Sequence, residues 1–137
     1  MSQEIIIDGY NFIACVLDVF PDNDFSSRVN REYLLSMLAS YAAVKNVQIS
    51  LVFDNKTNIS NYYGDRTWRG KIQIYYAQIG VSADDIITQL VSNHNNPKTL
   101  IIVSSDKRHV RKLTSGYGCN IKPANEFMRI LMKQEKN

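Results

Sequence analysis

The sequence predicts an α/β protein with a mostly parallel β-sheet that is covered by helices. Short apolar runs alternate with longer amphipathic segments in the order β-α-β-β-α-β-α-β-α, which is typical of parallel strands joined by helical crossovers. An aspartate stands at or soon after the end of four of these apolar runs. With 137 residues, 45% of them hydrophobic, the chain has an ordinary length for one domain and enough apolar side chains for a core. We therefore expect residues 1–137 to form a single domain.

The first half of the chain predicts two strands on either side of a long helix. Residues 4–7 form a short apolar strand, after which Gly9 permits a tight turn. Residues 11–20 can begin a short helix before a Pro-Asp-Asn-Asp break. Ser26 or Ser27 can cap the next helix, whose apolar residues recur at intervals of three and four: Leu34, Met37, Leu38, Tyr41 and Ala42. Residues 48–53 form the second strand.

The second half predicts three further strands and three helices. The polar stretch 55–70 contains no convincing helix, so we expect a long loop before a strand at residues 71–77. Ser82 caps a helix with a buried apolar face, and residues 95–97 end it. The remaining elements are a strand at 99–103, a helix at 107–114 with Gly116 just past its end, a strand at 119–121 and a terminal helix after Pro123.

Composition indicates the class of binding partner and the cellular compartment that we expect for this protein. The net charge of +3 is modest, but basic residues cluster at 66–71 and 107–112. Such clusters favour a polyanion partner, and the alternative is an ordinary solvent-exposed helix face. Cys15 and Cys119 have no zinc-binding spacing, and we expect both to be buried, reduced thiols of a cytoplasmic protein. We expect His94 and His109 to be exposed. No signal peptide, membrane span or phosphate-binding glycine loop is readable, so neither a membrane nor a nucleotide cofactor is expected.

The four aspartates at the strand ends predict a cation site. They are Asp8, Asp54, Asp84 and Asp106. Because the carboxyl ends of parallel strands share one edge of a sheet, we expect these carboxylates to converge there. Two carboxylates ~5 Å apart repel by roughly 3 kcal/mol at an effective dielectric of 20, and a hard divalent cation such as Mg²⁺ relieves that repulsion. Such a site suits phosphodiester hydrolysis.

Each aspartate also has a structural alternative when it is considered singly. Asp8 and Asp54 can be turn residues, and Asp106 can cap the helix that follows it. Ser82 and Asp85 form a capping-box pattern, which leaves Asp84 as the freer acid. Four independent caps at equivalent strand ends are harder to explain than one shared site.

The segment Ile-Ile-Ile-Asp-Gly-Tyr-Asn-Phe-Ile at residues 5–13 resembles the opening motif of YacP-like NYN domains, a branch of the PIN-like nucleases. Shorter segments agree with that family in order, at residues 51–54, 82–85, 103–106, 116–119 and 125–127. The resemblance spans about residues 4–131. It implies a PIN-like three-layer α/β/α sandwich, Mg²⁺ or Mn²⁺ as cofactor, and endonucleolytic cleavage of single-stranded RNA such as mRNA.

The resemblance also implies roles for single residues. The four aspartates would be catalytic, with Asp8, Asp84 and Asp106 as metal ligands, supported by Asn11, Asp85 and Ser105. Family members commonly carry a Glu where this chain has Thr88, so a catalytically weakened RNA-binding or regulatory module is the alternative. A phosphohydrolase acting on a small metabolite is a third hypothesis, against which the absence of an Asp-x-Asp pair after the first strand counts.

RNA binding calls for cations along the backbone and aromatic rings against unpaired bases. The residues that we expect to supply these contacts lie in the loop after Asp54 and beside Asp106: Tyr62, Tyr63, Arg66, Arg69, Lys107, Arg108 and Arg111. The ribosome, a translating mRNA and a second copy of the chain stay open as partners.

Overall fold

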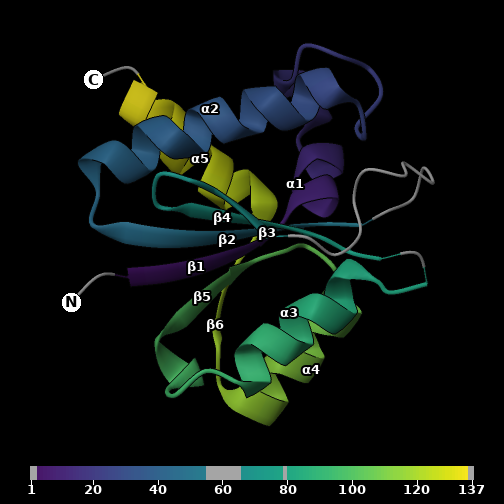
Figure 1. Cartoon of the computed structure of the whole chain (residues 1–137), viewed down its shortest axis with the longest axis vertical. Helices are drawn as coiled ribbons and strands as arrows, with labels where there is room; N and C mark the ends of the chain where they lie inside the picture. The colour runs from purple at the N-terminus through teal and green to yellow at the C-terminus, as the bar shows by residue number, and fades with distance from the viewer. Residues whose placement is uncertain (1–2, 55–65, 79, 136–137) are drawn as a thin grey trace.

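Six strands form one sheet, and helices lie against both of its faces (Figure 1). The structure is a computed structural model that describes residues 3–54, 66–78 and 80–135. The strands are β1 (Gln3–Asp8), β2 (Val47–Phe53), β3 (Arg66–Arg69), β4 (Ile72–Tyr76), β5 (Leu100–Val103) and β6 (Asn120–Lys122). The helices are α1 (Gly9–Cys15), α2 (Arg28–Val44), α3 (Ala83–Ser92), α4 (Lys107–Tyr117) and α5 (Ala124–Glu135), with short 3-10 turns η1 (Leu17–Val19) and η2 (Pro97–Thr99).

The sheet is parallel except at one edge, which confirms the predicted fold class. The strand order is β3-β4-β2-β1-β5-β6, and β3 alone among the described strands runs antiparallel, against β4. In the centre, Ile7 of β1 lies opposite Leu51 of β2 and Val103 of β5. The chain builds outward from β1 to β2 and β4, then returns to the other side of β1 as β5. A crevice that can bind a ligand is expected at such a reversal, beside the carboxyl ends of the strands.

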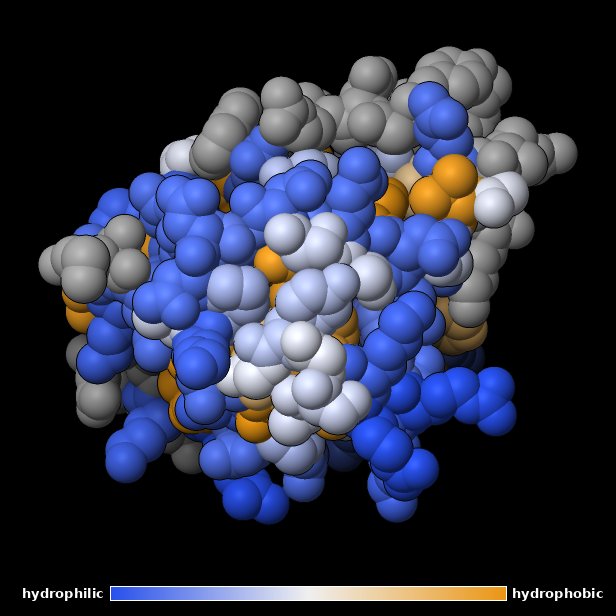
Figure 2. Space-filling view, turned by 90° about the horizontal axis from the view of Figure 1, so that it is seen from below, coloured by the Kyte–Doolittle hydropathy of each residue, from blue (hydrophilic) through white to orange (hydrophobic). Residues whose placement is uncertain are grey.

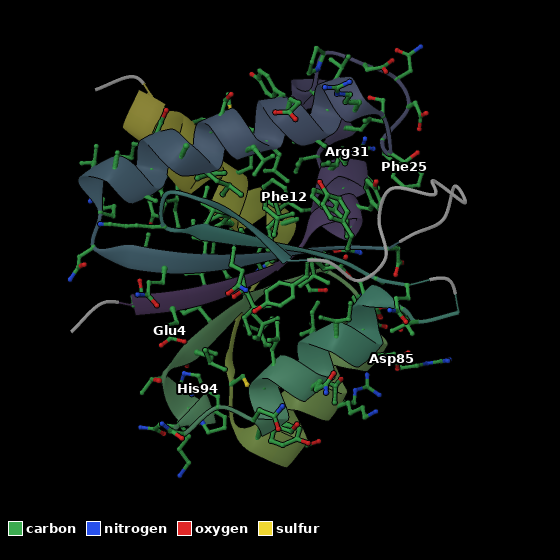
Figure 3. The ribbon with its side chains drawn as sticks, in the orientation of Figure 1. Glu4, Phe12, Phe25, Arg31, Asp85 and His94 are labelled. Atoms are coloured by element: carbon green, nitrogen blue, oxygen red, sulfur yellow. The ribbon has the colours of Figure 1, made fainter. Side chains whose placement is uncertain are left out.

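Alternation along the strands divides the apolar side chains between two cores. Ile5 and Ile7 of β1 belong to the core under α1, α2 and α5, whereas Ile6 belongs to the core under α3 and α4. Phe12 of α1 points into the first core, where its ring lies 6.0 Å from that of Phe127 in α5 (Figure 3). Successive strand residues point to opposite faces, so a sheet buried on both sides requires nearly continuous apolar strands.

Several local expectations differ from the structure. Residues 66–69, which were expected to lie in a loop, form β3. α4 continues to Tyr117 and ends at Gly118, whose φ of 74° is left-handed, so the expectation that Gly116 follows the helix is wrong. Gly116 and Gly118 are both turn formers in the sequence, and the backbone N–H of Gly118, which bonds to Thr114 at 3.0 Å, decides between them.

The cysteines divide between surface and core. Cys119 is buried, but Cys15 is exposed on α1, so the expectation of two buried thiols is wrong for Cys15. Phe12 and Ile13 occupy the buried face of α1, whereas Ala14 and Cys15 lie on its exposed face. Within the described residues, none of the helices combines the length and apolar character needed to cross a membrane.

Candidate active site

The four aspartates line a single cavity of about 260 Å³ at the carboxyl ends of β1, β2 and β5. The other residues around this acidic cavity are Tyr10, Asn11, Ala14, Phe25 and Ser82. Three helices, α1, α3 and α4, begin beside it. Their N-terminal N–H groups are suited to carboxylates, so the fold gathers these acids at an edge where backbone donors partly offset their repulsion.

Asp8 and Asp54 are held by backbone N–H groups. Asp8 is the last residue of β1 and the N-cap of α1, and its carboxylate accepts the N–H of Asn11 at 3.5 Å. Asp54 directly follows β2 and accepts the backbone N–H of Ala83. The second bond joins the end of β2 to the first turn of α3, and it thereby places the neighbouring Asp84 at the cavity.

Asp106 and Asp84 are connected through His109. Asp106 caps α4 and accepts the backbone N–H of His109 at 3.3 Å. The ring Nδ1 of His109 lies 3.0 Å from a carboxylate oxygen of Asp84, and its Nε2 lies 3.0 Å from the hydroxyl of Thr88. His109 is 5% exposed, so the expectation of an exposed histidine is wrong. The packing of α3 on α4 buries this ring, and the sequence carries no signal for that packing.

The expected supporting residues act on the backbone around the cavity. The side-chain oxygen of Asn11 accepts the N–H of Ser105 at 3.0 Å and ties α1 to the β5–α4 turn. The hydroxyl of Ser105 accepts the N–H of Ala124 at 3.1 Å, where α5 begins. Asp85 lies on the exposed side of α3 and completes the capping box with Ser82, so it does not line the acidic cavity.

Burial and mutual repulsion disfavour ionisation in the acidic cavity. Asp8 is 8% exposed, and burial together with the negative charges of Asp84, Asp54 and Asp106 raises its pKa to about 7, against the opposing N–H of Asn11. Burial also raises the pKa of Asp84, where the nearby His109 acts in the opposite direction. Asp85 does not line the cavity, and the backbone N–H of Ser82, which its carboxylate accepts, lowers its pKa. The described part of the cavity therefore gathers carboxylates whose ionisation burial and mutual repulsion oppose.

The donor set of the acidic cavity fits a hard divalent cation. Aspartates from four separate segments line one cavity, and burial together with their mutual repulsion raises the pKa of Asp8. No three acidic, histidine or cysteine side chains in residues 3–54, 66–78 and 80–135 are already arranged to enclose an ion. Mg²⁺ usually keeps several of its waters and takes only one or two carboxylates directly, so it does not need all four acids as direct ligands.

Two aromatic side chains, Tyr10 and Phe25, also line the acidic cavity. Phe25 is partly exposed and lies edge-to-face with Tyr10, with the two ring centroids 6.0 Å apart. The loop that carries Phe25 is fixed by buried Arg31, which donates to the carbonyl of Ser26 at 2.7 Å and to the hydroxyl of Tyr10 at 3.1 Å (Figure 3). Phe25 lies far in the sequence from the acidic motifs, so sequence reasoning gave no signal for its place here.

The structure describes some of the residues that we expect to bind RNA. Lys107, Arg108 and Arg111 are exposed in the first turns of α4, next to Asp106, and we call them the basic face of α4. Viewed from the side of α3 and α4, the molecule is covered mainly by hydrophilic residues (Figure 2). Arg66 and Arg69 belong to β3 at the edge of the sheet. Tyr62 and Tyr63 lie outside the described residues.

A larger hollow at the opposite end of the strands has different chemistry. It has a volume of about 620 Å³ and is lined mainly by amide side chains, with Glu4 bonded to His94 at 2.9 Å. Figure 3 shows Glu4 and His94 at the far end of the molecule from Asp85. His94 is partly buried in this pair and is not the freely exposed residue that was expected. A single carboxylate among its lining residues does not make a cation site comparable with the acidic cavity.

Comparisons with known proteins agree with the arrangement of motifs and strands. Rae1 (YacP) from Bacillus subtilis has a similar fold, with a TM-score of 0.77 and 22% identity over 98% of this chain and 76% of that chain. A single-residue mutant of that protein gives a TM-score of 0.76 and 21% identity over 98% of this chain and 77% of that chain. No curated protein sequence matches significantly. The family model of the YacP-like NYN domain matches residues 5–137, and the chain therefore belongs to the YacP-like NYN domain family.

Proposed function

We propose that this protein is a divalent-metal-dependent endoribonuclease that cuts single-stranded RNA in the acidic cavity lined by the four aspartates. The observation that carries the proposal is the convergence of these carboxylates around one cavity, where their charges and burial raise the pKa of Asp8 to about 7. Membership of a family of PIN-like nucleases supports the same activity. Mg²⁺ or Mn²⁺ is the cofactor that the oxygen donors favour.

Some residues of the cavity would bind the cation, and others would fix the positions of the residues that bind it. Asp8, Asp84 and Asp106 would hold the cation, with Asp54 close to them and fixed to the start of α3. When bound, a divalent cation supplies Lewis-acid polarisation of the phosphodiester and makes water easier to ionise. Asn11 and Ser105 keep the turns around the acids in register. Asp85 acts at a distance, through the cap of α3.

Single-stranded RNA suits the surroundings of the acidic cavity. The basic face of α4 follows Asp106 directly and can attract the phosphate backbone. Phe25, which is partly exposed in the cavity wall, offers a ring on which an unpaired base can stack. Arg66 and Arg69 at the sheet edge, with Tyr62 and Tyr63, would extend the contact along the strand.

The decisive experiment incubates labelled single-stranded RNA with the purified protein in Mn²⁺, Mg²⁺ or EDTA. We expect metal-dependent internal cleavage that Asp8→Asn and Asp106→Asn abolish without unfolding the protein. Asp18→Asn is the matched control, because Asp18 is exposed in η1 and does not line the acidic cavity. Cleavage at the wild-type rate by both cavity variants would refute the assignment of the site.

A non-catalytic RNA-binding module is the second candidate, and Thr88 is the feature that favours it. Threonine lacks the carboxylate that the family commonly has at this position. Its hydroxyl instead lies 3.0 Å from the ring Nε2 of His109. RNA binding without cleavage in any metal, unchanged by Thr88→Glu, would select this candidate. Turnover of an aryl phosphate but not of RNA would select a phosphohydrolase.

Further parts of the proposal concern organisation and setting. We infer that residues 1–137 are one domain, because all six described strands share one sheet. We propose a cytoplasmic location, with RNA as the main partner. Association with ribosomes or translating mRNA is tested by co-sedimentation, and a homodimer by light scattering at several protein concentrations.

A further inference from the structure

We propose that His109 is a positioning residue that holds the carboxylate of Asp84 toward the cation of the acidic cavity. The proposal rests on the proposed function, since it assigns a role within the same site. The imidazole lies between α3 and α4, with one ring nitrogen beside Asp84 and the other beside Thr88. Asp84 and Thr88 are one helical turn apart, so both face the same side of α3 and meet one ring.

Asp84 differs from the other three acids in how it is held. Asp8, Asp54 and Asp106 each accept a backbone N–H, from Asn11, Ala83 and His109 respectively. Among the described residues, the contact of the Asp84 carboxylate is the ring of His109, at 3.0 Å. The Asp84 side chain is 42% exposed, and the described residues give its carboxylate no hydrogen bond or ion pair besides this contact.

The environment of His109 makes it suited to hold a neighbour in place. The ring is buried, and Thr88 fixes its orientation through Nε2. Its Nδ1 is fully buried and, although close to Asp84, is not aligned with it as a hydrogen bond. With its proton on Nδ1, the ring can donate toward Asp84 while Nε2 accepts from the hydroxyl of Thr88. Because a buried donor without an acceptor costs free energy, the ring favours a carboxylate of Asp84 that stays beside Nδ1.

His109 also connects two of the proposed metal ligands. Its backbone N–H is bonded to the Asp106 carboxylate, while its ring contacts Asp84. One residue therefore sets the separation between an acid on α3 and the acid that caps α4. Groups that orient metal ligands from behind commonly change metal affinity by about 10–100-fold when they are altered.

Two substitutions at one position separate positioning from packing. In His109→Asn the side-chain amide reaches the place of Nδ1 and can still donate to Asp84. In His109→Gln the amide reaches the place of Nε2, beside Thr88, and leaves Asp84 without its partner. We would measure Mn²⁺ affinity by the loss of the free-ion signal in electron paramagnetic resonance. Thermal unfolding in EDTA would show whether each variant is folded.

We expect His109→Gln to weaken Mn²⁺ binding by about 10-fold or more, and His109→Asn to stay within about 3-fold of wild type. Cleavage at a fixed, subsaturating Mn²⁺ concentration should show a lower kcat for His109→Gln with an unchanged KM for RNA. Equal Mn²⁺ affinity in wild type and folded His109→Gln would overturn this proposal alone. Equal losses in both variants, with equal loss of thermal stability, would show a packing role and also overturn it. A folded wild type without Mn²⁺ affinity would overturn the cation site and this proposal together.

Discussion

Replacing Asp8 by Asn should make the metal-free protein more stable at alkaline pH. The pKa of Asp8 is about 7 in the folded protein, against an ordinary value of 3.8, because burial and three neighbouring carboxylates oppose its charge. The folded state therefore binds this proton more tightly than the unfolded state does. The corresponding stability is fully present below about pH 4 and is lost as the pH rises through about 7.

The size of the effect follows from the two pKa values of Asp8. At about 1.36 kcal/mol per pH unit, the difference between 3.8 and about 7 corresponds to roughly 4 kcal/mol of lost stability once the folded group is ionised. Asn is neutral at every pH, and its carbonyl can still accept the N–H of Asn11 that Asp8 accepts now. We therefore expect Asp8→Asn to gain up to about 4 kcal/mol over wild type at pH 8 and almost nothing at pH 4.

Urea unfolding in EDTA, followed by circular dichroism at pH 4 and pH 8, measures both differences. Added Mg²⁺ at pH 8 should stabilise the wild type more than Asp8→Asn, because a cation relieves the repulsion that the substitution removes. The reasoning fails if Asp8→Asn is the less stable protein at pH 8. It also fails if the difference between the two proteins is the same at both pH values.

Further predictions concern packing and substrate binding. Gly9→Ala should lose about 1–3 kcal/mol in urea unfolding, because a Cβ at Gly9 would overlap the ring of Phe53. Gly116→Ala, inside α4 with open space around it, should instead gain about 0.5–1 kcal/mol. Phe25→Ala should raise KM for single-stranded RNA by roughly 5–150-fold and Phe25→Trp should restore it, since stacking contributes about 1–3 kcal/mol per base; an unchanged KM would remove Phe25 from the RNA path. Replacing the basic face of α4 by alanines should reduce the magnitude of the slope of log affinity against log salt concentration by about 2, because three phosphate contacts are lost. Filter binding at several salt concentrations measures this slope, and an unchanged slope would show that the RNA does not contact this face.

The architecture could be predicted because its signals are local. Ile5, Ile6 and Ile7 are all apolar, which indicates a strand buried on both faces, and the structure places Ile6 opposite in direction to its two neighbours. Ser27 and Ser82 cap their helices through the N–H three residues on, as the cap signals predicted. β3 escaped prediction because an edge strand of four residues depends on its pairing with β4 rather than on its own pattern.

The convergence of the four aspartates could be predicted from the sequence, but the residues that surround them could not. Asp8 ends β1, and Asp106 follows the end of the adjacent parallel strand β5 by three residues, which places both at one edge of the sheet. The burial of His109 and the place of Phe25 in the cavity wall depend on the packing of α3 against α4 and on a loop fixed by Arg31. Both arrangements join residues that are far apart in the chain, so no local pattern reports them.

By itself, the sequence determined the layered fold, the family and the edge of the sheet at which the acids lie. It could do so because strand direction and apolar periodicity are written in neighbouring residues. Tertiary structure alone decided the surroundings of Asp84, where the ring of His109 from α4 lies beside both Asp84 and Thr88 of α3. Contacts of that kind depend on the angle and register of packed helices, which many sequences with the same pattern would set differently.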